Sequence, residues 1–130
     1  MMYVKYSLLF AVLIFLISCS TDDITGDDLI EGEWVVTAGY KDGKPEGESY
    51  CSPSVDPGLE FKDEETVYSK GYESDFSYEL EKDNEGVIIN LQRIDGSMHR
   101  TFFIEKISED EFGLVGRLFF EGQNCYFERQ

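Results

Sequence analysis

The chain has 130 residues, enough for one domain, and it carries 27 Asp and Glu against 11 Lys and Arg, a formal net charge of −16. So negative a surface repels phosphate backbones and anionic headgroups, which argues against nucleic acid as a partner. Ten Phe, eight Tyr and one Trp argue against a disordered chain, because they are enough to fill a core.

The first residues have the layout of a secretory signal. Lys5 precedes ten unbroken apolar residues, 8–17, and Ser18 and Cys19 follow them. A membrane-spanning helix needs about 18 apolar residues or more, so this run is too short to stay in the bilayer. The junction resembles a bacterial lipobox, which implies that residues 1–18 are a signal peptide and that Cys19 carries a lipid anchor. An ordinary secretory signal and a buried apolar segment are the alternatives.

The residues after the cut indicate a destination. Ser20 stands where an inner-membrane retention signal would place Asp, which favours the outer membrane, on its periplasmic face or at the cell surface. Residues 19–28 are expected to form a flexible tether, because the stretch after Cys19 is polar, acidic and free of aromatic residues.

From Gly32 onward, apolar and polar residues alternate and turn residues recur at short intervals, which predicts strands rather than helices. Most predicted connections are short, and Asp95-Gly96 is a hairpin signal, so each strand should pair with the next. An antiparallel meander removes its open edges by closing. The sequence therefore predicts an all-β fold over 29–130, an eight-stranded up-and-down barrel, with a β-sandwich as the alternative. The predicted strands are 33–40, 59–62, 66–69, 75–82, 87–94, 98–107, 112–120 and 123–129.

One connection, 41–58, is far longer than a hairpin needs, and long loops in compact domains tend to be lids or binding elements. It holds Cys51. In an eight-stranded barrel this loop leaves the first strand beside the start of the last one, where Cys125 lies. If Cys19 is lipidated, two cysteines remain, and an oxidising compartment predicts a Cys51–Cys125 disulfide. Two buried free thiols are the alternative.

The same strand count places Trp34, at the start of the first strand, near Arg129, at the end of the last. Gly32-Glu33-Trp34 followed by seven more strands and a final Arg resembles the lipocalins, and looks most like the short lipocalin-like lipoproteins of Gram-negative bacteria. The resemblance implies that Gly32, Trp34 and Arg129 close the base of the barrel, with the guanidinium packed across the indole ring. It also implies that the long first loop folds over the barrel mouth.

No motif favours an enzyme, so no catalytic residue is predicted. His99 is the only histidine, and the sequence contains neither a nucleophile elbow nor a phosphate-binding glycine loop. The acidic runs 63–65 and 109–111 lack the spacing of a calcium loop. We therefore expect no metal and no cofactor.

Two binding functions are predicted. In the first, a small apolar or amphipathic ligand binds at the barrel mouth, with Tyr40, Tyr50, Tyr68 and Tyr78 as candidate contacts. The alternative role for these tyrosines is to fill the barrel. In the second function, the protein is a protein-binding module, an inhibitor or accessory subunit of an envelope complex, whose acidic surface engages a basic partner. A monomer is expected in both cases.

Overall fold

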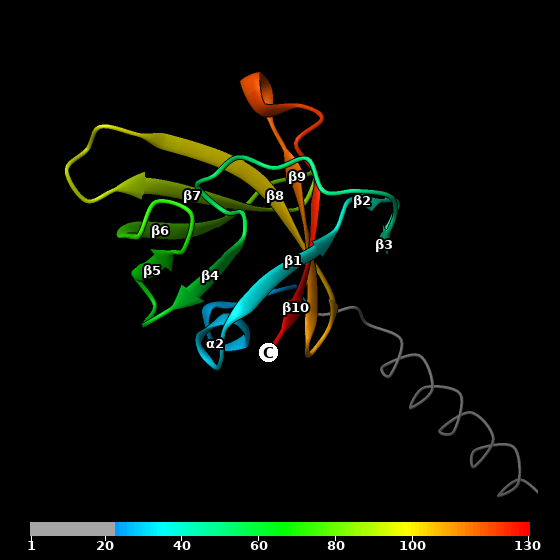
Figure 1. Cartoon of the computed structure of the whole chain (residues 1–130), viewed down its shortest axis with the longest axis horizontal. Coiled ribbons are helices and arrows are strands. Elements are labelled where there is room, and N and C mark those ends of the chain that lie inside the picture. The colour runs from blue at the N-terminus through cyan, green and yellow to red at the C-terminus, as the bar shows by residue number, and fades with distance from the viewer. Residues whose placement is uncertain (1–22) are drawn as a thin grey trace, which may run out of the picture.

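The computed structural model describes residues 23–130 (Figure 1). The predicted signal peptide and Cys19 lie outside these residues. Eight strands form a closed antiparallel barrel in the order β1-β10-β9-β8-β7-β6-β5-β4, which confirms the predicted barrel over the sandwich. The barrel strands are β1 (Trp34–Ala38), β4 (Gly58–Phe61), β5 (Thr66–Ser69), β6 (Ser74–Lys82), β7 (Val87–Arg93), β8 (His99–Ser108), β9 (Glu111–Gly116) and β10 (Cys125–Arg129).

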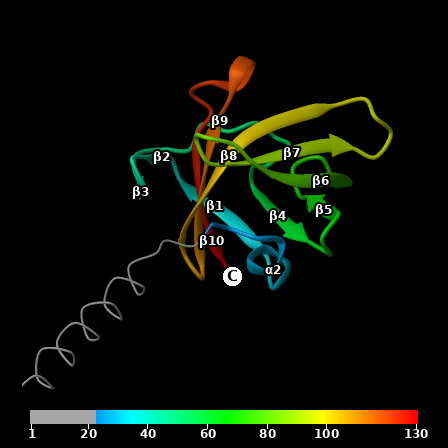
Figure 2. The ribbon, with the colours of Figure 1, turned by 180° about the vertical axis from the view of Figure 1, so that it is seen from behind.

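Closure depends on the first strand, which pairs on both sides. Trp34 stands opposite Arg129 of β10 and opposite Leu59 of β4. Outside the barrel, a two-stranded hairpin formed by β2 (Tyr40–Lys41) and β3 (Lys44–Pro45) projects from the end of β1. Figures 1 and 2 show this hairpin to one side of the barrel.

Because successive strands alternate in direction, the barrel has two distinct ends. At the end that we call the base lie α2 (Gly26–Ile30), the C-terminus and the turns 62–65, 83–86 and 109–110. At the opposite end, the mouth, lie the turns 70–73 and 94–98 and the loops 46–57 and 117–124, the last of which contains the short 3-10 helix η1 (Leu118–Phe120). Both ribbon views show α2 and η1 at opposite ends (Figures 1 and 2).

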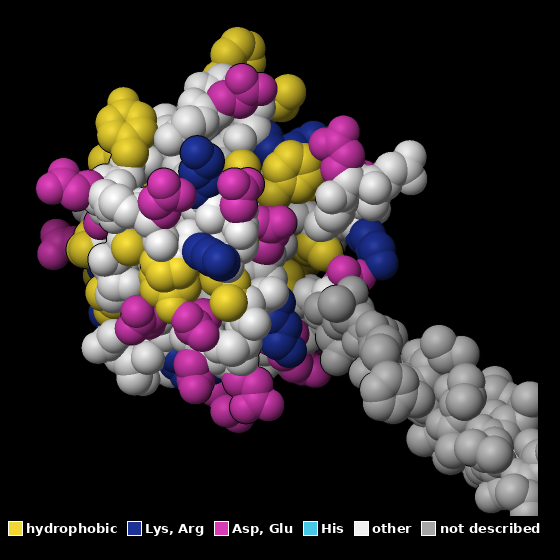
Figure 3. Space-filling view, turned by 90° about the vertical axis from the view of Figure 1, so that its right-hand side faces the viewer, with side chains coloured by type: hydrophobic (Ala, Val, Ile, Leu, Met, Phe, Trp, Pro, Cys, Tyr) yellow, Lys and Arg dark blue, Asp and Glu magenta, His cyan; other side chains and the backbone are white. Residues whose placement is uncertain are grey.

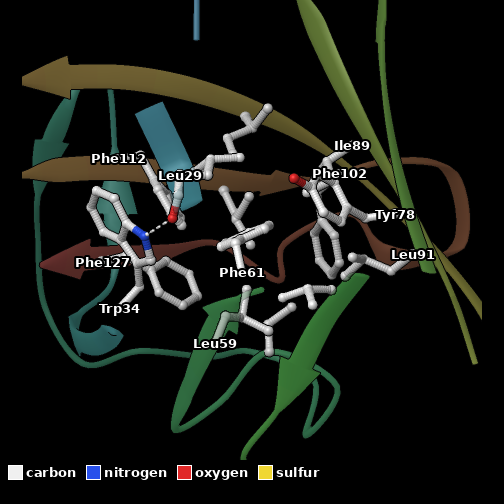
Figure 4. Packing of buried hydrophobic residues seen from close by; sticks show 14 of the residues in the cluster. Leu29, Trp34, Leu59, Phe61, Tyr78, Ile89, Leu91, Phe102, Phe112 and Phe127 are labelled. Atoms are coloured by element: carbon white, nitrogen blue, oxygen red, sulfur yellow. Dashed lines mark hydrogen bonds between the residues drawn. The ribbon is translucent and has the colours of Figure 1, made fainter. Parts of the chain in front are cut away.

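Alternate positions of the strands point inward and form one continuous core (Figure 4). Large aromatic rings dominate it. Phe112 lies between Trp34 and Phe127, with ring centroids 4.7 and 4.6 Å away, and Phe61 meets Tyr78 edge-on at 4.9 Å. The largest fully buried side chains are Trp34, Phe61, Phe76, Phe102, Phe112, Phe127, Leu29, Leu59, Ile89, Leu91, Leu114 and Val55.

The structure corrects two boundaries. The flexible tether is expected over residues 19–28, but the part of this stretch that the structure describes is fixed, because Ile24 is buried and α2 begins at Gly26, with Leu29 completely buried against the core. Two isolated apolar residues are enough to fix this segment, although its average composition is that of a tether. The strand expected over 112–120 ends at Gly116, and the chain then turns into η1.

Within the described residues, no helix combines the length and the apolar character that a bilayer crossing requires.

Candidate functional site

The base of the barrel is closed by Trp34 and Arg129. The indole Nε1 donates a hydrogen bond of 2.9 Å to the Leu29 carbonyl, which fixes α2 across the opening (Figure 4). The Arg129 guanidinium lies 4.3 Å from the centre of the indole ring, the contact that the lipocalin resemblance implies. Gly32 has a φ of +83°, which favours glycine, and a side chain there would also press on the aliphatic part of Arg129. Both the backbone conformation and the lack of space therefore favour glycine at this position.

Arg129 also links three segments of backbone. Its Nη2 donates to the carbonyls of Asp28 and Glu109, at 2.8 and 2.7 Å, and its Nη1 donates to the carbonyl of Glu31. The helix, the short segment that joins it to β1 and the β8–β9 turn are therefore held by one side chain. These contacts close the barrel at its base.

Asp28 completes this closure. Its carboxylate accepts hydrogen bonds from the backbone and hydroxyl of Thr25 and lies 3.2 Å from the Lys106 ammonium. Partial burial by itself would raise the pKa of Asp28, but the hydrogen bonds from Thr25 and Lys106 outweigh it and lower the pKa. The helix start is thus held by an ionised acid.

The mouth is closed by the 46–57 loop, as the resemblance implies. Val55 is fully buried and belongs to the core. The predicted disulfide between Cys51 and Cys125 is present, with the Cα atoms 6.1 Å apart, and it ties the loop to β10. A side chain at Gly71 would collide with the carbonyls of Pro53 and Asp56, so the loop also packs tightly on the β5–β6 turn.

Between the two closures, the inward-facing side chains form the continuous buried core described above. The hollows that we find over residues 23–130 lie on the outer surface or at a rim. The most voluminous of them, about 580 Å³, is an open polar depression on the outer face of β6 to β8, lined by residues such as Glu79, Asn90 and His99. These hollows lie outside the barrel core, and the ligand expected at the barrel mouth stays a prediction.

The four candidate tyrosines do not form one pocket. Tyr78 points into the barrel and donates a hydrogen bond of 2.7 Å to the Asp63 carbonyl. Burial, followed by the nearby charge of Asp63, raises its pKa to about 12. Tyr68 lies on the outside of β5, with the Lys62 ammonium 5.6 Å from its ring.

Tyr40 and Tyr50 do come close together, but outside the barrel. Tyr40 is buried over Gly113, where any side chain would collide with its ring, and its hydroxyl donates to Glu105 at 2.7 Å. Burial and this carboxylate raise the pKa of Tyr40. Tyr50 is 73% exposed, and both rings line an open hollow of about 340 Å³ beside Asn124. Period-two alternation could not place them, because both follow the regular part of the first strand, which ends at Ala38.

The feature that sequence reasoning missed is at the mouth. Leu118 and Phe119, which we call the tip, are 69% and 96% exposed. The predicted strand 112–120 would have buried every second residue here. The two signals that could have revealed the tip are Gly116 within the run and Glu121-Gly122 immediately after it.

The loop that carries the tip is well fixed. Phe120 folds back, with its ring centroid 6.3 Å from that of Phe102, and its carbonyl accepts a hydrogen bond of 3.0 Å from the Gln123 backbone. Asn124 accepts a hydrogen bond from the Gly116 backbone at 3.2 Å. Gly116 leaves the space for this turn, because a side chain there would collide with the Phe120 carbonyl.

Charge is distributed unequally between the two ends. The base turns 62–65, 83–86 and 109–110 contain three, two and two acidic residues, and α2 adds Asp27 and Asp28. The mouth turns 70–73 and 94–98 and the 117–124 loop contain one acid each, while the 46–57 loop adds three. On the face seen in Figure 3, apolar side chains project at the top and acidic side chains gather at the bottom.

The described residues contain no group of three or more His, Cys, Asp or Glu side chains arranged to hold a metal ion. Comparisons with known proteins found no match to a family model, to a curated protein or to a solved structure. The resemblance to lipocalins therefore stays a prediction beyond the barrel architecture itself.

Proposed function

We propose that this protein is an envelope lipoprotein that docks a partner protein through the mouth of its barrel. The observation that carries the proposal is the tip: Leu118 and Phe119 are exposed side by side on a fixed loop. Scattered single apolar residues on a surface need no explanation, but adjacent large ones on a projecting loop are typical of interaction sites. This is the second of the two functions predicted from the sequence, with the contact moved from the acidic surface to the mouth.

The backbone of the tip supports a functional role. Leu118 has φ +55°, a left-handed conformation that costs a residue with a Cβ roughly 1–2 kcal/mol. Its side chain gains no burial in return. Backbone strain that the fold does not need is found preferentially at functional sites. A partner that covers the tip would supply the missing burial.

The short connection between the predicted anchor at Cys19 and the base also favours the mouth as the docking surface. If Cys19 is lipidated, only three residues lie between it and Asp23, and the four Cα–Cα steps between the two span at most about 14 Å. The fold continues from there into α2 at the base, so the base lies close to the membrane. The mouth then faces away from the bilayer, toward other proteins of the envelope. We place the protein on the outer membrane, as the sequence predicts.

One observation favours a second candidate function. The outer hollow shared by Tyr40 and Tyr50 combines an exposed aromatic face with the carboxylates of Glu46 and Glu48 and the Asn124 amide. A small amphipathic ligand would find there both an apolar surface and hydrogen-bond partners. This would be binding beside the mouth rather than within the barrel.

Site-specific photo-crosslinking in the cells that make the protein tests the docking proposal. Benzoylphenylalanine replaces Phe119, and in a control it replaces Thr37, which is also exposed but lies on the outer face of β1. We expect one adduct of defined mass at position 119, absent at position 37 and lost when Leu118 is changed to Ser. Equal labelling at the two positions, or none at 119, would overturn the proposal. Loss of palmitate labelling in Cys19→Ala tests the anchor separately.

A further inference from the structure

The chemistry of the partner can be inferred from the charges around the tip. We infer that the mouth binds an acidic segment of the partner, one that places carboxylates against Arg100 and Arg117 and an apolar side chain against Leu118 and Phe119. This inference rests on the proposed docking function and adds the sign of charge and the contacting groups.

Arg100 and Arg117 lie at the root of the 117–124 loop. The ladder between β8 and β9 ends at the pair Phe102–Gly116. Arg100 lies two residues before this pair on β8, and Arg117 follows it directly, at the start of η1. The Arg100 guanidinium lies 5.0 Å from the centre of the Phe120 ring, and that of Arg117 lies 4.7 Å from the centre of the Phe103 ring. Both cations are thus positioned by aromatic faces beside the tip.

Neither guanidinium has a carboxylate within ion-pair distance among residues 23–130, in a chain whose net charge is −16. The Arg100 Nη1 donates to the neighbouring His99 carbonyl at 3.0 Å, and its Nε is buried without a hydrogen-bond partner. Glu121, in the same loop, forms no ion pair with either arginine. Donors that are partly desolvated and unpaired bind an added acceptor favourably.

Most other cations of the domain are already paired. Carboxylates lie within 3.2 Å of five of them, one of which, Lys70, belongs to a mouth turn: Lys62, Lys70, Lys82, Lys106 and Arg129. At the mouth, Arg93 has a looser contact, with Asp95 at 3.9 Å. Lys41 and Lys44 of the β2–β3 hairpin also form no ion pair, but both are exposed to solvent. Among residues 23–130, Arg100 and Arg117 are the unpaired cations that are partly buried.

Guanidinium groups held over aromatic rings still present N–H donors that can bind carboxylates. Arginine and aromatic residues are also the side chains most enriched at the energetic centres of protein interfaces. The base turns and α2 hold nine acidic residues, whereas the mouth turns and loops hold six beside the two unpaired arginines. The base therefore repels an acidic segment more strongly than the mouth does, and this difference favours docking at the mouth. A basic partner would instead be drawn to the base.

Three blocked synthetic peptides test this inference by NMR titration of the protein beginning at Ser20. They share Leu-Trp and differ only in the flanking residues: two Glu, two Gln or two Lys on each side. A contact between a guanidinium and a carboxylate is worth about 1 kcal/mol, or about fivefold in affinity. We expect the Glu peptide to bind at least about fivefold more tightly than the Gln peptide. Its binding should shift the amide signals of residues 100 and 117–120.

The variants separate this inference from the docking proposal. Arg100→Gln and Arg117→Gln should each lower the affinity for the Glu peptide by about threefold to fivefold and leave the affinity for the Gln peptide unchanged. Arg93→Gln is the matched control and should change neither. Phe119→Ser should weaken all three peptides.

Equal binding of the Glu and Gln peptides, both weakened by Phe119→Ser, would overturn the acidic preference and leave the docking surface standing. Preference for the Lys peptide, with shifts at the base turns, would overturn the inference in favour of a basic partner. If no peptide shifts the amide signals of the tip, the inference fails. The crosslink at position 119 then tests the docking proposal independently.

Discussion

Replacement of Arg129 by alanine should be among the most destabilising single changes in the domain. The substitution removes the guanidinium from the Trp34 ring and leaves three backbone carbonyls, those of Asp28, Glu31 and Glu109, without their donor. It also removes the ion pair with Asp110, where Nε and Oδ1 are 3.2 Å apart.

The size of the effect follows from these contacts. A hydrogen bond to a charged group contributes about 1.5–3 kcal/mol when buried, and less at a half-exposed site. A cation over an aromatic ring adds about 0.5–1 kcal/mol. The Asp110 carboxylate is 76% exposed, so its ion pair adds little. We expect the free energy of unfolding to fall by about 3–4 kcal/mol, a large part of the 5–15 kcal/mol typical of a domain.

Urea unfolding of the protein beginning at Ser20, followed by Trp34 fluorescence and by circular dichroism, measures this change. With a slope of about 1.5 kcal/mol per molar urea, the midpoint should fall by about 2 M. The stability of Arg129→Lys should lie between that of the unmodified protein and that of Arg129→Ala. The lysine ammonium keeps the charge but cannot reach three carbonyls at once. The matched control is Arg93→Ala, at the mouth, which should cost less than about 1 kcal/mol. If Arg129→Ala costs no more than this control, the reasoning that one side chain holds the base together is refuted.

Three further predictions test the closures and the buried phenols. Cys51→Ala with Cys125→Ala should lower the free energy of unfolding by about 4 kcal/mol, because the bond closes a loop with a sequence separation of 74, and urea unfolding measures it. Gly113→Ala should displace the Tyr40 ring and release the β2–β3 hairpin, so that the Tyr40 phenol titrates closer to pH 10 in an ultraviolet absorbance titration; an unchanged titration would show that the hairpin tolerates the collision. The raised pKa of Tyr78, about 12 against a usual 10.0, means that the folded state favours the neutral phenol. The free energy of unfolding should therefore fall as the pH rises from about 10 toward 12. In alkaline unfolding curves, the free energy of unfolding of Tyr78→Phe should fall less steeply over that range.

The barrel itself could be predicted because its signals are local. Alternation along strands such as Asp75 to Lys82 shows which face is buried, and short turns such as Asp95-Gly96 make neighbours in sequence neighbours in the sheet. Once eight strands are counted, the pairing of the first with the last follows from topology. It places Trp34 beside Arg129 and Cys51 within reach of Cys125 without further information.

The N-terminal helix could not be predicted in this way. Residues 19–28 have the composition of a tether, and the two apolar residues that fix the segment, Ile24 and Leu29, are too few for a periodic pattern. Their burial depends on the opening that the finished barrel leaves at its base. This is a tertiary effect, and no window of the sequence contains it.

The tip could not be predicted either, but here the local pattern was strong rather than weak. The run of apolar residues continues past the point where the strand ends. From Phe112 to Phe120 the residues are mostly apolar, and a strand reading assigns such residues to the core. The barrel interior has no room for them, since Phe102, Phe112 and Phe127 already fill the space between β8, β9 and β10. The chain therefore leaves the sheet after Gly116, and only Phe120 returns to cover it. Two large apolar side chains that the core could not accept stay at the surface beside two unpaired arginines. The exposure of the two apolar side chains adds nothing to the core, and this is the reason for our proposal that the tip binds a partner.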